Sequence, residues 1–165
     1  MRAELRPATA EDVPRITTIY NEYVAGSHVS FDAEPWTVEE RLTWFTAKDG
    51  ALHQVWVAGV DGEVVGAAWS GPWRDKDAYA RSVETTVVID PARLDAGIGT
   101  ALYDALLRAV EASGAHRAYA VIALPNDASV AFHHKLGFRT IGVLDEVGEK
   151  MGRWWSTELL EKKMA

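Results

Sequence analysis

The sequence contains no cysteine. Disulfide bridges, thiolate nucleophiles and thiol-ligated metals are therefore excluded as sources of stability or catalysis. Long apolar runs are also missing, because no stretch approaches the roughly 18 consecutive apolar residues that a membrane-spanning helix needs. The first residues, from Met1 to Arg6, lack the apolar core of a secretion signal. We expect a cytoplasmic protein without a membrane-embedded part.

Positive charge is scarce. Lys and Arg number 17 against 24 Asp and Glu, which gives a formal net charge of -7. Proteins that bind nucleic acids or anionic lipids present a basic surface, so this balance argues against both classes of partner. An acidic protein suits a cationic ligand such as an amine, although a charge total does not locate the binding surface. The 165 residues fit one domain with its own core, and we expect residues 1–165 to form it.

Hydrophobic spacing predicts strands and helices in alternation along the chain. The predicted strands are residues 3–7, 54–60, 64–70, 79–89, 119–124, 139–144 and 153–160. The predicted helices are residues 10–24, 38–47, 97–112 and 129–135. Asp61-Gly62 is a strong two-residue hairpin turn, which requires some antiparallel pairing. We therefore expect a mixed sheet with helices on both faces, in α+β or α/β style.

The segment after the fourth predicted strand has the composition of a phosphate-binding loop. Asp90-Pro91 ends the strand, and Gly97-Ile98-Gly99 opens the next helix. Glycine lets a ligand approach the backbone closely, and a helix N-terminus offers unpaired N–H groups at the positive end of its dipole. An ordinary turn before a helix would look the same, and the short motif alone favours that simpler interpretation. The Walker and Rossmann spacings are both absent.

Further motifs stand in a fixed order along the chain. They are Ile19-Tyr20-Asn21, Val29-Ser30-Phe31, Glu34-Pro35, Gly71-Pro72-Trp73-Arg74, Val83-Glu84, Leu124-Pro125-Asn126-Asp127 and Leu136-Gly137-Phe138. With the glycine loop among them, the chain resembles the GNAT acetyltransferase superfamily, and within it the phosphinothricin and methionine sulfoximine acetyltransferase group. The resemblance covers almost the whole chain, and the order of so many pieces is far more specific than any one of them.

The resemblance implies a GNAT fold. This is an α+β (α/β-like) fold with a mixed, mostly antiparallel central sheet of about six to seven strands, helices on both faces and a splay between strands 4 and 5. It also implies direct transfer of an acetyl group from acetyl-CoA to a small amine, with no metal and no covalent enzyme intermediate. Enzymes of this group are usually homodimers.

The resemblance assigns cofactor contacts to the fourth strand, the glycine loop and the residue after the fifth strand. These residues are Val87, Val88, Ile89, Asp95, Ala96, Gly97, Ile98, Gly99, Thr100 and Asn126. Leu94 and Asp95 depart from the family pattern, which has Gln or Arg and then a basic residue there. Backbone N–H groups can hold a pyrophosphate without those side chains, and we expect Asp95 to point to solvent or to cap the helix. Asn126 has a second interpretation as the N-cap of the following helix.

Glu84 is the candidate general base, because it precedes the cofactor loop and matches the glutamate of the group by position. The alternative is a solvated carboxylate paired with Arg81. Tyr103 and His133 are candidate proton donors to the leaving thiolate. Tyr103 fits the edge of an amphipathic core equally well, and a lone histidine on a helix is more often structural.

The resemblance also implies a substrate site with cations and an aromatic wall. The matching residues are Phe31, Arg74, Lys76 and Tyr79. The alternative is a solvated loop in which Asp75 and Asp77 neutralise the two cations. The predicted reaction is N-acetylation of a small amino-acid-like substrate. Two other functions remain open, namely a protein or peptide N-acetyltransferase and a non-catalytic sensor that binds acyl-CoA.

Overall fold

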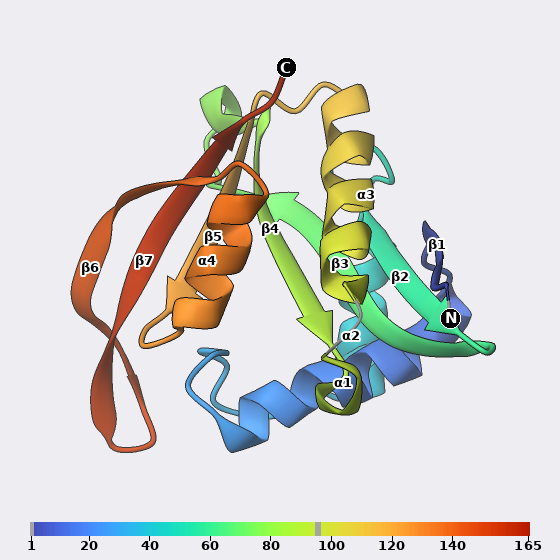
Figure 1. Cartoon of the computed structure of the whole chain (residues 1–165), viewed down its shortest axis with the longest axis horizontal. Coiled ribbons are helices and arrows are strands. Elements are labelled where there is room, and N and C mark those ends of the chain that lie inside the picture. Colours follow the sequence, from blue (N-terminus) through green and yellow to red (C-terminus); the bar gives the residue numbers. More distant parts are fainter. Residues whose placement is uncertain (1, 95–96) are drawn as a thin grey trace.

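The computed structural model describes residues 2–94 and 97–165, and a seven-stranded sheet forms its centre (Figure 1). The strands are β1 (Glu4–Pro7), β2 (Val55–Val60), β3 (Glu63–Pro72), β4 (Ser82–Ile89), β5 (Arg117–Ala123), β6 (Arg139–Lys150) and β7 (Arg153–Lys163). Their order in the sheet is β1-β2-β3-β4-β5-β7-β6. Only β4 and β5 run parallel among these neighbours, which confirms the predicted mixed and mostly antiparallel sheet.

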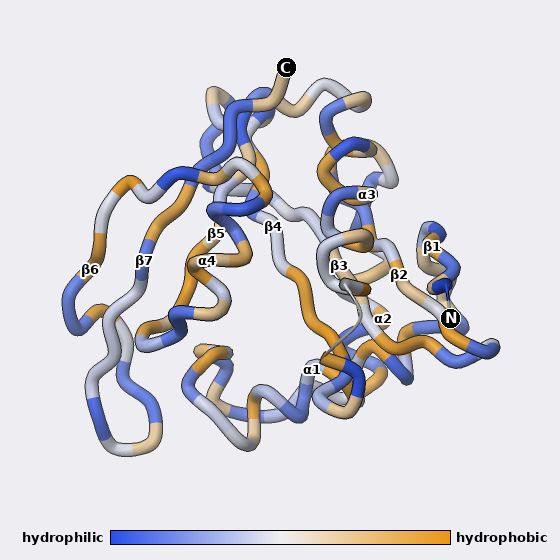
Figure 2. The backbone as a smooth tube through the Cα atoms, in the orientation of Figure 1, coloured by the Kyte–Doolittle hydropathy of each residue, from blue (hydrophilic) through white to orange (hydrophobic). Residues whose placement is uncertain are grey.

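Helices cover both faces of the sheet (Figure 1). They are α1 (Val13–Gly26), α2 (Val38–Thr46), α3 (Ile98–Ala112) and α4 (Asp127–Lys135). On one face, α3 buries Leu102 and Leu106 in a core that α4 extends with Phe132. On the other face, α1 buries Ile16 and Ile19 in a second core. Figure 2 shows the apolar side of α3 as bands along the helix. None of the helices described here is both long and apolar enough to cross a membrane.

Local sequence signals place most of these elements. Asp61 and Gly62 both have positive φ, of 52° and 82°, as the turn between β2 and β3 requires. Thr37 caps α2 by accepting a hydrogen bond from the Glu40 N–H. Gly97 precedes α3 in the left-handed conformation, at φ 69°. The predicted hairpin and the helix after the glycine loop are therefore confirmed to within two residues at each end.

Three strand boundaries differ by three or more residues from the prediction. The fourth strand begins at Ser82 rather than at residue 79, because Asp77–Tyr79 forms a short 3-10 helix. The β6–β7 hairpin is longer than predicted and continues to Lys150 and Lys163. Most of β6 is exposed, so its residues carry no clean apolar alternation. Register shifts between Thr140 and Gly142 and between Leu144 and Gly148 disturb its pattern further.

A buried arginine joins α2 to the second core. Arg41 is 2% exposed. Its guanidinium carbon lies 4.4, 4.0 and 4.7 Å from the ring centroids of Tyr20, Trp36 and Trp44. Within the described residues, its Nε and Nη2 atoms have no hydrogen-bond partner, and burial lowers the pKa of the group. Cation–π attraction to the aromatic faces therefore offsets the desolvation of this charge.

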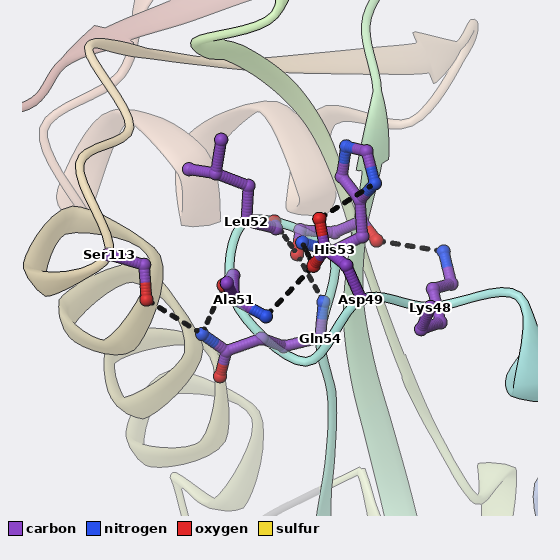
Figure 3. Close-up of polar contacts among 8 residues, drawn as sticks. Lys48, Asp49, Ala51, Leu52, His53, Gln54 and Ser113 are labelled. Carbon is purple, nitrogen blue, oxygen red and sulfur yellow. Dashed lines mark hydrogen bonds and ion pairs between the residues drawn. The ribbon is translucent and has the colours of Figure 1, made fainter.

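The loop between α2 and β2 is held by its own polar contacts (Figure 3). The Asp49 carboxylate accepts hydrogen bonds from the N–H groups of Ala51 and His53, at 2.8 and 2.9 Å. Lys48 Nζ donates to the Ser70 carbonyl at 2.8 Å, and burial lowers the pKa of this lysine to about 8. The Asp49 bonds order the loop itself, and the Lys48 bond ties the loop to β3, the strand next to β4.

Candidate active site

The candidate site lies where β4 and β5 separate. Their ladder contains only Ser82 to Glu84 on β4, paired with Arg117 to Tyr119 on β5. Beyond Glu84 the two strands diverge, as Figure 1 shows for the lower half of the sheet. A cleft of about 690 Å³ opens between them, lined by Thr85 to Ile89 of β4 and Ala120 to Ala123 of β5. The predicted splay between strands 4 and 5 is confirmed.

Backbone groups of β4 point into this cleft. The N–H of Asp90 bonds to the Val65 carbonyl on β3, and no register shift interrupts the β3–β4 ladder. Because alternate residues of a strand direct their N–H and C=O groups to opposite sides, those of Val87 and Ile89 point toward β5. Tyr23 donates its hydroxyl to the Ile89 carbonyl at 2.5 Å. The N–H groups of Val87 and Ile89 are thus directed at the space between the strands.

The glycine loop borders the same cleft. Gly97, Ile98, Gly99 and Thr100 line it, and α3 begins at Ile98. The first N–H groups of this helix have no acceptor within the helix, so they can bind an anion. Asp95 and Ala96, two of the predicted cofactor residues, lie outside the described residues. Leu94, where the family pattern has Gln or Arg, is 68% exposed.

Asn126 borders the cleft from the start of α4. Its side-chain oxygen accepts a hydrogen bond from the Ser129 N–H at 3.2 Å, which is the N-cap role. Asn126 also lines the cleft. The two interpretations of this residue are compatible, because capping uses the amide oxygen and leaves the two N–H donors of the side chain for a ligand.

Glu84 lies at the closed end of the cleft, where the strands part. No hydrogen bond or ion pair joins its carboxylate to another of the described residues, and burial raises its pKa. Arg81, the alternative partner, donates instead to the Gly114 carbonyl at 2.8 Å. A half-buried carboxylate with a raised pKa and no cation beside it has the properties of a general base.

His133 lines the cleft from α4, but its hydrogen bonding constrains its chemistry. Its Nδ1 lies 2.7 Å from the Ser129 carbonyl, and a carbonyl can only accept. Nδ1 therefore carries the proton, and Nε2 of the neutral ring is an acceptor. Burial lowers the pKa of His133, so the cationic form that could donate a proton from Nε2 is disfavoured.

Tyr103 is fully buried, and it is not part of the cleft wall. Its hydroxyl lies 2.6 Å from the Thr85 hydroxyl, and burial raises its pKa. The rings of Phe132 and Phe138 stack near it, at centroid distances of 5.8 and 5.9 Å. The structure favours the core interpretation of Tyr103 over contact with a cofactor or thiolate.

Phe31 also lines the cleft, from the segment between α1 and α2. Its ring rests on Gly148 of β6, where an added Cβ would lie 2.4 Å from Phe31 Cε2. Lys150 Nζ donates to the carbonyls of Val24 and Ser30, at 2.9 and 2.6 Å. The β6–β7 hairpin therefore fixes the segment that carries Phe31.

The other predicted substrate residues lie elsewhere. Arg74, Lys76 and Tyr79 gather around a separate hollow of about 520 Å³, which shares no lining residue with the main cleft. Trp73 stacks on Tyr119 at 4.3 Å, and Tyr119 is the cross-strand partner of Glu84. The structure thus brings the cationic residues to the neighbourhood of Glu84 without placing them in the cleft with Phe31.

Sequence reasoning missed several residues that line the cleft. Arg93 precedes the glycine loop and adds a cation near the start of α3. Tyr23 and Thr157 come from α1 and β7, far from the loop in sequence. Arg93 could have been found from the sequence, because it lies close to the glycine loop. Tyr23 and Thr157 had none, because only tertiary packing brings them to the cleft.

Comparisons with known proteins agree with this geometry. The model of the acetyltransferase (GNAT) family matches residues 16–138. The phosphinothricin N-acetyltransferase of Streptomyces coelicolor is 43% identical to this chain, over 98% of this chain and 96% of its own length. The L-methionine sulfoximine/L-methionine sulfone acetyltransferase of Pseudomonas aeruginosa is 34% identical, over 93% of this chain and 90% of its own length.

A solved structure of similar fold contains the acetyl donor. The phosphinothricin acetyltransferase of Sinorhizobium meliloti, in complex with acetyl-CoA, superposes with a TM-score of 0.95. The two sequences are 32% identical, and the match covers 100% of this chain and 90% of that chain. The fold is thus shared with a protein whose structure contains acetyl-CoA.

The contact between Phe31 and Gly148 can be tested by adding a methyl group. Gly148→Ala is expected to lower the free energy of unfolding by about 1–2 kcal/mol, because the added methyl group would displace the Phe31 ring. Gly142→Ala is the matched control on the same strand, since a Cβ there meets nothing within 4 Å. Urea unfolding of both variants measures the difference. Equal stability of the two variants would show that the ring does not depend on Gly148.

Proposed function

Because the chain belongs to the acetyltransferase (GNAT) family, we propose that it acetylates the amino group of a small amino acid of the phosphinothricin or methionine sulfoximine type. The chain is an acetyl-CoA-dependent acyltransferase by family. The observation that carries the finer proposal is the half-buried Glu84 carboxylate at the closed end of the cleft between β4 and β5. The names of the relatives at 43% and 34% identity supply the substrate class.

In this proposal, acetyl-CoA lies along the parted strands. The N–H groups at the start of α3 and the Arg93 side chain hold the pyrophosphate, and Asn126 donates to the cofactor from the other wall. The pantetheine arm pairs with the free edge of β4 at Val87 to Ile89. One N–H of this edge also donates to the carbonyl oxygen of the thioester, which becomes negatively charged during the reaction.

The acceptor approaches from the side of Glu84 and Phe31. Glu84 takes one proton from the ammonium group, directly or through one water, and the free amine attacks the thioester carbon. The tetrahedral intermediate expels the thiolate, which takes the second proton from the nitrogen as the amide forms. Glu84 is the catalytic base, and the neutral His133 ring leaves the thiolate to this internal proton transfer rather than protonating it. Arg74, Lys76 and Tyr79 are the candidate groups for an anionic head of the acceptor.

Thioester cleavage tests this function. The purified protein is mixed with acetyl-CoA and a panel of amino acids that includes phosphinothricin, methionine sulfoximine and methionine sulfone. Turnover with one of these small acceptors is expected. Turnover only with peptides would favour a protein acetyltransferase, and tight acetyl-CoA binding without turnover would favour a sensor.

The ionisation of Glu84 should determine how kcat falls at acidic pH. Its carboxyl pKa is raised by burial above the ordinary value of 4.5, so kcat rises as the pH increases through that raised pKa and the base becomes ionised. Glu84→Gln should lower kcat by about a hundredfold and remove this fall at acidic pH, while the affinity for acetyl-CoA is kept. Glu22→Gln, at an exposed position on α1, is the control. The same fall at acidic pH in Glu84→Gln would eliminate Glu84 as the base.

We also propose that residues 1–165 act as one cytoplasmic domain and that two copies associate through the β6–β7 hairpin. β6 is an edge strand that carries several exposed apolar side chains, and unpaired edges and exposed apolar surface both favour association. These residues are Ile141, Val143, Leu144 and Val147 on β6, with Met151 and Trp154 at the turn and on β7.

The association can be measured by light scattering after gel filtration. The expected mass is about twice the 18.1 kDa of one chain. Replacing Val143 and Val147 with Glu should give the single-chain mass, because two charges would enter the apolar patch. Leu42→Glu adds a charge to an exposed apolar residue of α2, outside the hairpin, and should leave the mass unchanged. A wild-type protein of single-chain mass at micromolar concentration rules out this interface.

A further inference from the structure

Thr157 carries a buried hydroxyl that forms no hydrogen bond with any other described residue. The residue is 4% exposed, and its Oγ1 has no hydrogen-bond partner among the described residues. It nevertheless lines the cleft between β4 and β5. An unpaired buried hydroxyl is costly, so its presence at a ligand cleft indicates a partner that arrives with the ligand.

Strand registers show which side of the sheet this hydroxyl occupies. Glu84 of β4 is the direct partner of Tyr119 on β5, so their side chains share one face. Side chains alternate along a strand, which places Val121 and Ala123 on that face as well. Ala123 is in turn the direct partner of Thr157 on β7. Thr157 therefore lies on the same face as Glu84.

The opposite face belongs to the core under α3. Thr85, the neighbour of Glu84, bonds there to the Tyr103 hydroxyl at 2.6 Å. Leu160 of β7 is fully buried in the same core. Thr157 is thus separated from the α3 side by the sheet itself, and it faces the side from which the proposed acceptor reaches Glu84.

Thr157 is also close to the wall that holds Phe31. Gly148, against which the Phe31 ring packs, is the cross-strand partner of Trp155. Trp155 and Thr157 are two residues apart on β7, so they share a face. The Trp155 ring stacks on His28 at 4.3 Å, which brings the segment before Phe31 against this strand. Thr157 therefore lies near the part of the cleft that Phe31 lines.

We propose that the Thr157 hydroxyl donates a hydrogen bond to an oxygen of the acceptor amino acid and so selects among acceptors; this inference rests on the proposed function. β5 lies between β4 and β7, so neighbouring strand spacings put Thr157 roughly 10 Å or more from the Glu84 strand. The amine that reacts beside Glu84 cannot also reach Thr157. The hydroxyl therefore contacts the far end of the acceptor, at an oxygen of its side chain, because the carboxylate is bonded to the same carbon as the amine.

The test compares Thr157→Val and Thr157→Ser with the matched control Thr17→Val. Valine keeps the shape of threonine and removes the hydroxyl, whereas serine keeps the hydroxyl. Thr17 is a buried threonine of α1, outside the cleft lining, whose hydroxyl donates to the Val13 carbonyl at 2.7 Å. Each variant is assayed for its melting temperature without ligand and for the KM values of the acceptor and of acetyl-CoA.

Thr157→Val is expected to raise the acceptor KM about tenfold, which is the loss of one hydrogen bond of ordinary strength. Its KM for acetyl-CoA should not rise and its melting temperature should not fall, because no hydrogen bond within the free protein is lost. Thr157→Ser should restore the acceptor KM to within about threefold of wild type, because the hydroxyl is kept. Thr17→Val should lower the melting temperature and leave both KM values unchanged.

The choice of acceptor locates the oxygen. A tenfold effect with methionine sulfone but not with methionine is expected, because only the sulfone carries oxygens on its side chain. Two results overturn the inference while wild-type turnover persists. One is an unchanged acceptor KM in Thr157→Val, and the other is a raised KM for acetyl-CoA alone. No turnover by the wild-type protein with any amino acid would instead contradict the proposed function.

Discussion

The separation of β4 from β5 after Glu84 is the constraint on which the rest of the site depends. A strand inside a sheet normally has both edges paired, and an unpaired buried backbone group is costly. β4 keeps its full ladder to β3 but bonds to β5 only over Ser82 to Glu84. The Ile89 carbonyl accepts from Tyr23, and the remaining edge groups, the N–H groups of Val87 and Ile89 and the Val87 carbonyl, need a partner other than a strand. A ligand with amide groups of its own, such as a pantetheine arm, satisfies them as a strand would.

The same separation gives the site two sides with different chemistry. On the α3 side, the parted strands meet the start of a helix, and the groups offered to a ligand are largely backbone N–H groups and Arg93. On the α1 side, Glu84 and Thr157 share a sheet face, and no cation among the described residues pairs with the carboxylate. Burial there keeps the Glu84 pKa raised, which suits proton transfer from an amine. A donor and an acceptor can thus meet in the gap from opposite sides.

Much of the fold could be predicted from the sequence, because its signals are local. The Asp61-Gly62 turn, the caps and the apolar stripe of α3 each fix an element within a few residues. The start of β4 at Ser82 and the length of β6 could not be predicted, since neither a 3-10 helix nor an exposed edge strand has a clear hydrophobic period. In the site, Glu84 and Asn126 were placed by family position. For Tyr103 the sequence left a cofactor contact and a core edge open, because it could not show that the hydroxyl would meet Thr85.

The two sides also differ in how strongly they depend on particular side chains. Leu94 departs from the family pattern and is exposed. The anion-binding groups at the start of α3 do not need its side chain, because a helix start binds anions through its backbone N–H groups. The side proposed for the acceptor does depend on particular residues. There the Phe31 ring needs the bare backbone of Gly148, and its segment needs the two bonds from Lys150. Substitutions can therefore accumulate around the donor with little effect, whereas a single methyl or hydroxyl near Phe31 changes the shape and polarity offered to the acceptor. In the proposed reaction, the β6–β7 hairpin and the segment it holds therefore affect the choice of acceptor more than the glycine loop does.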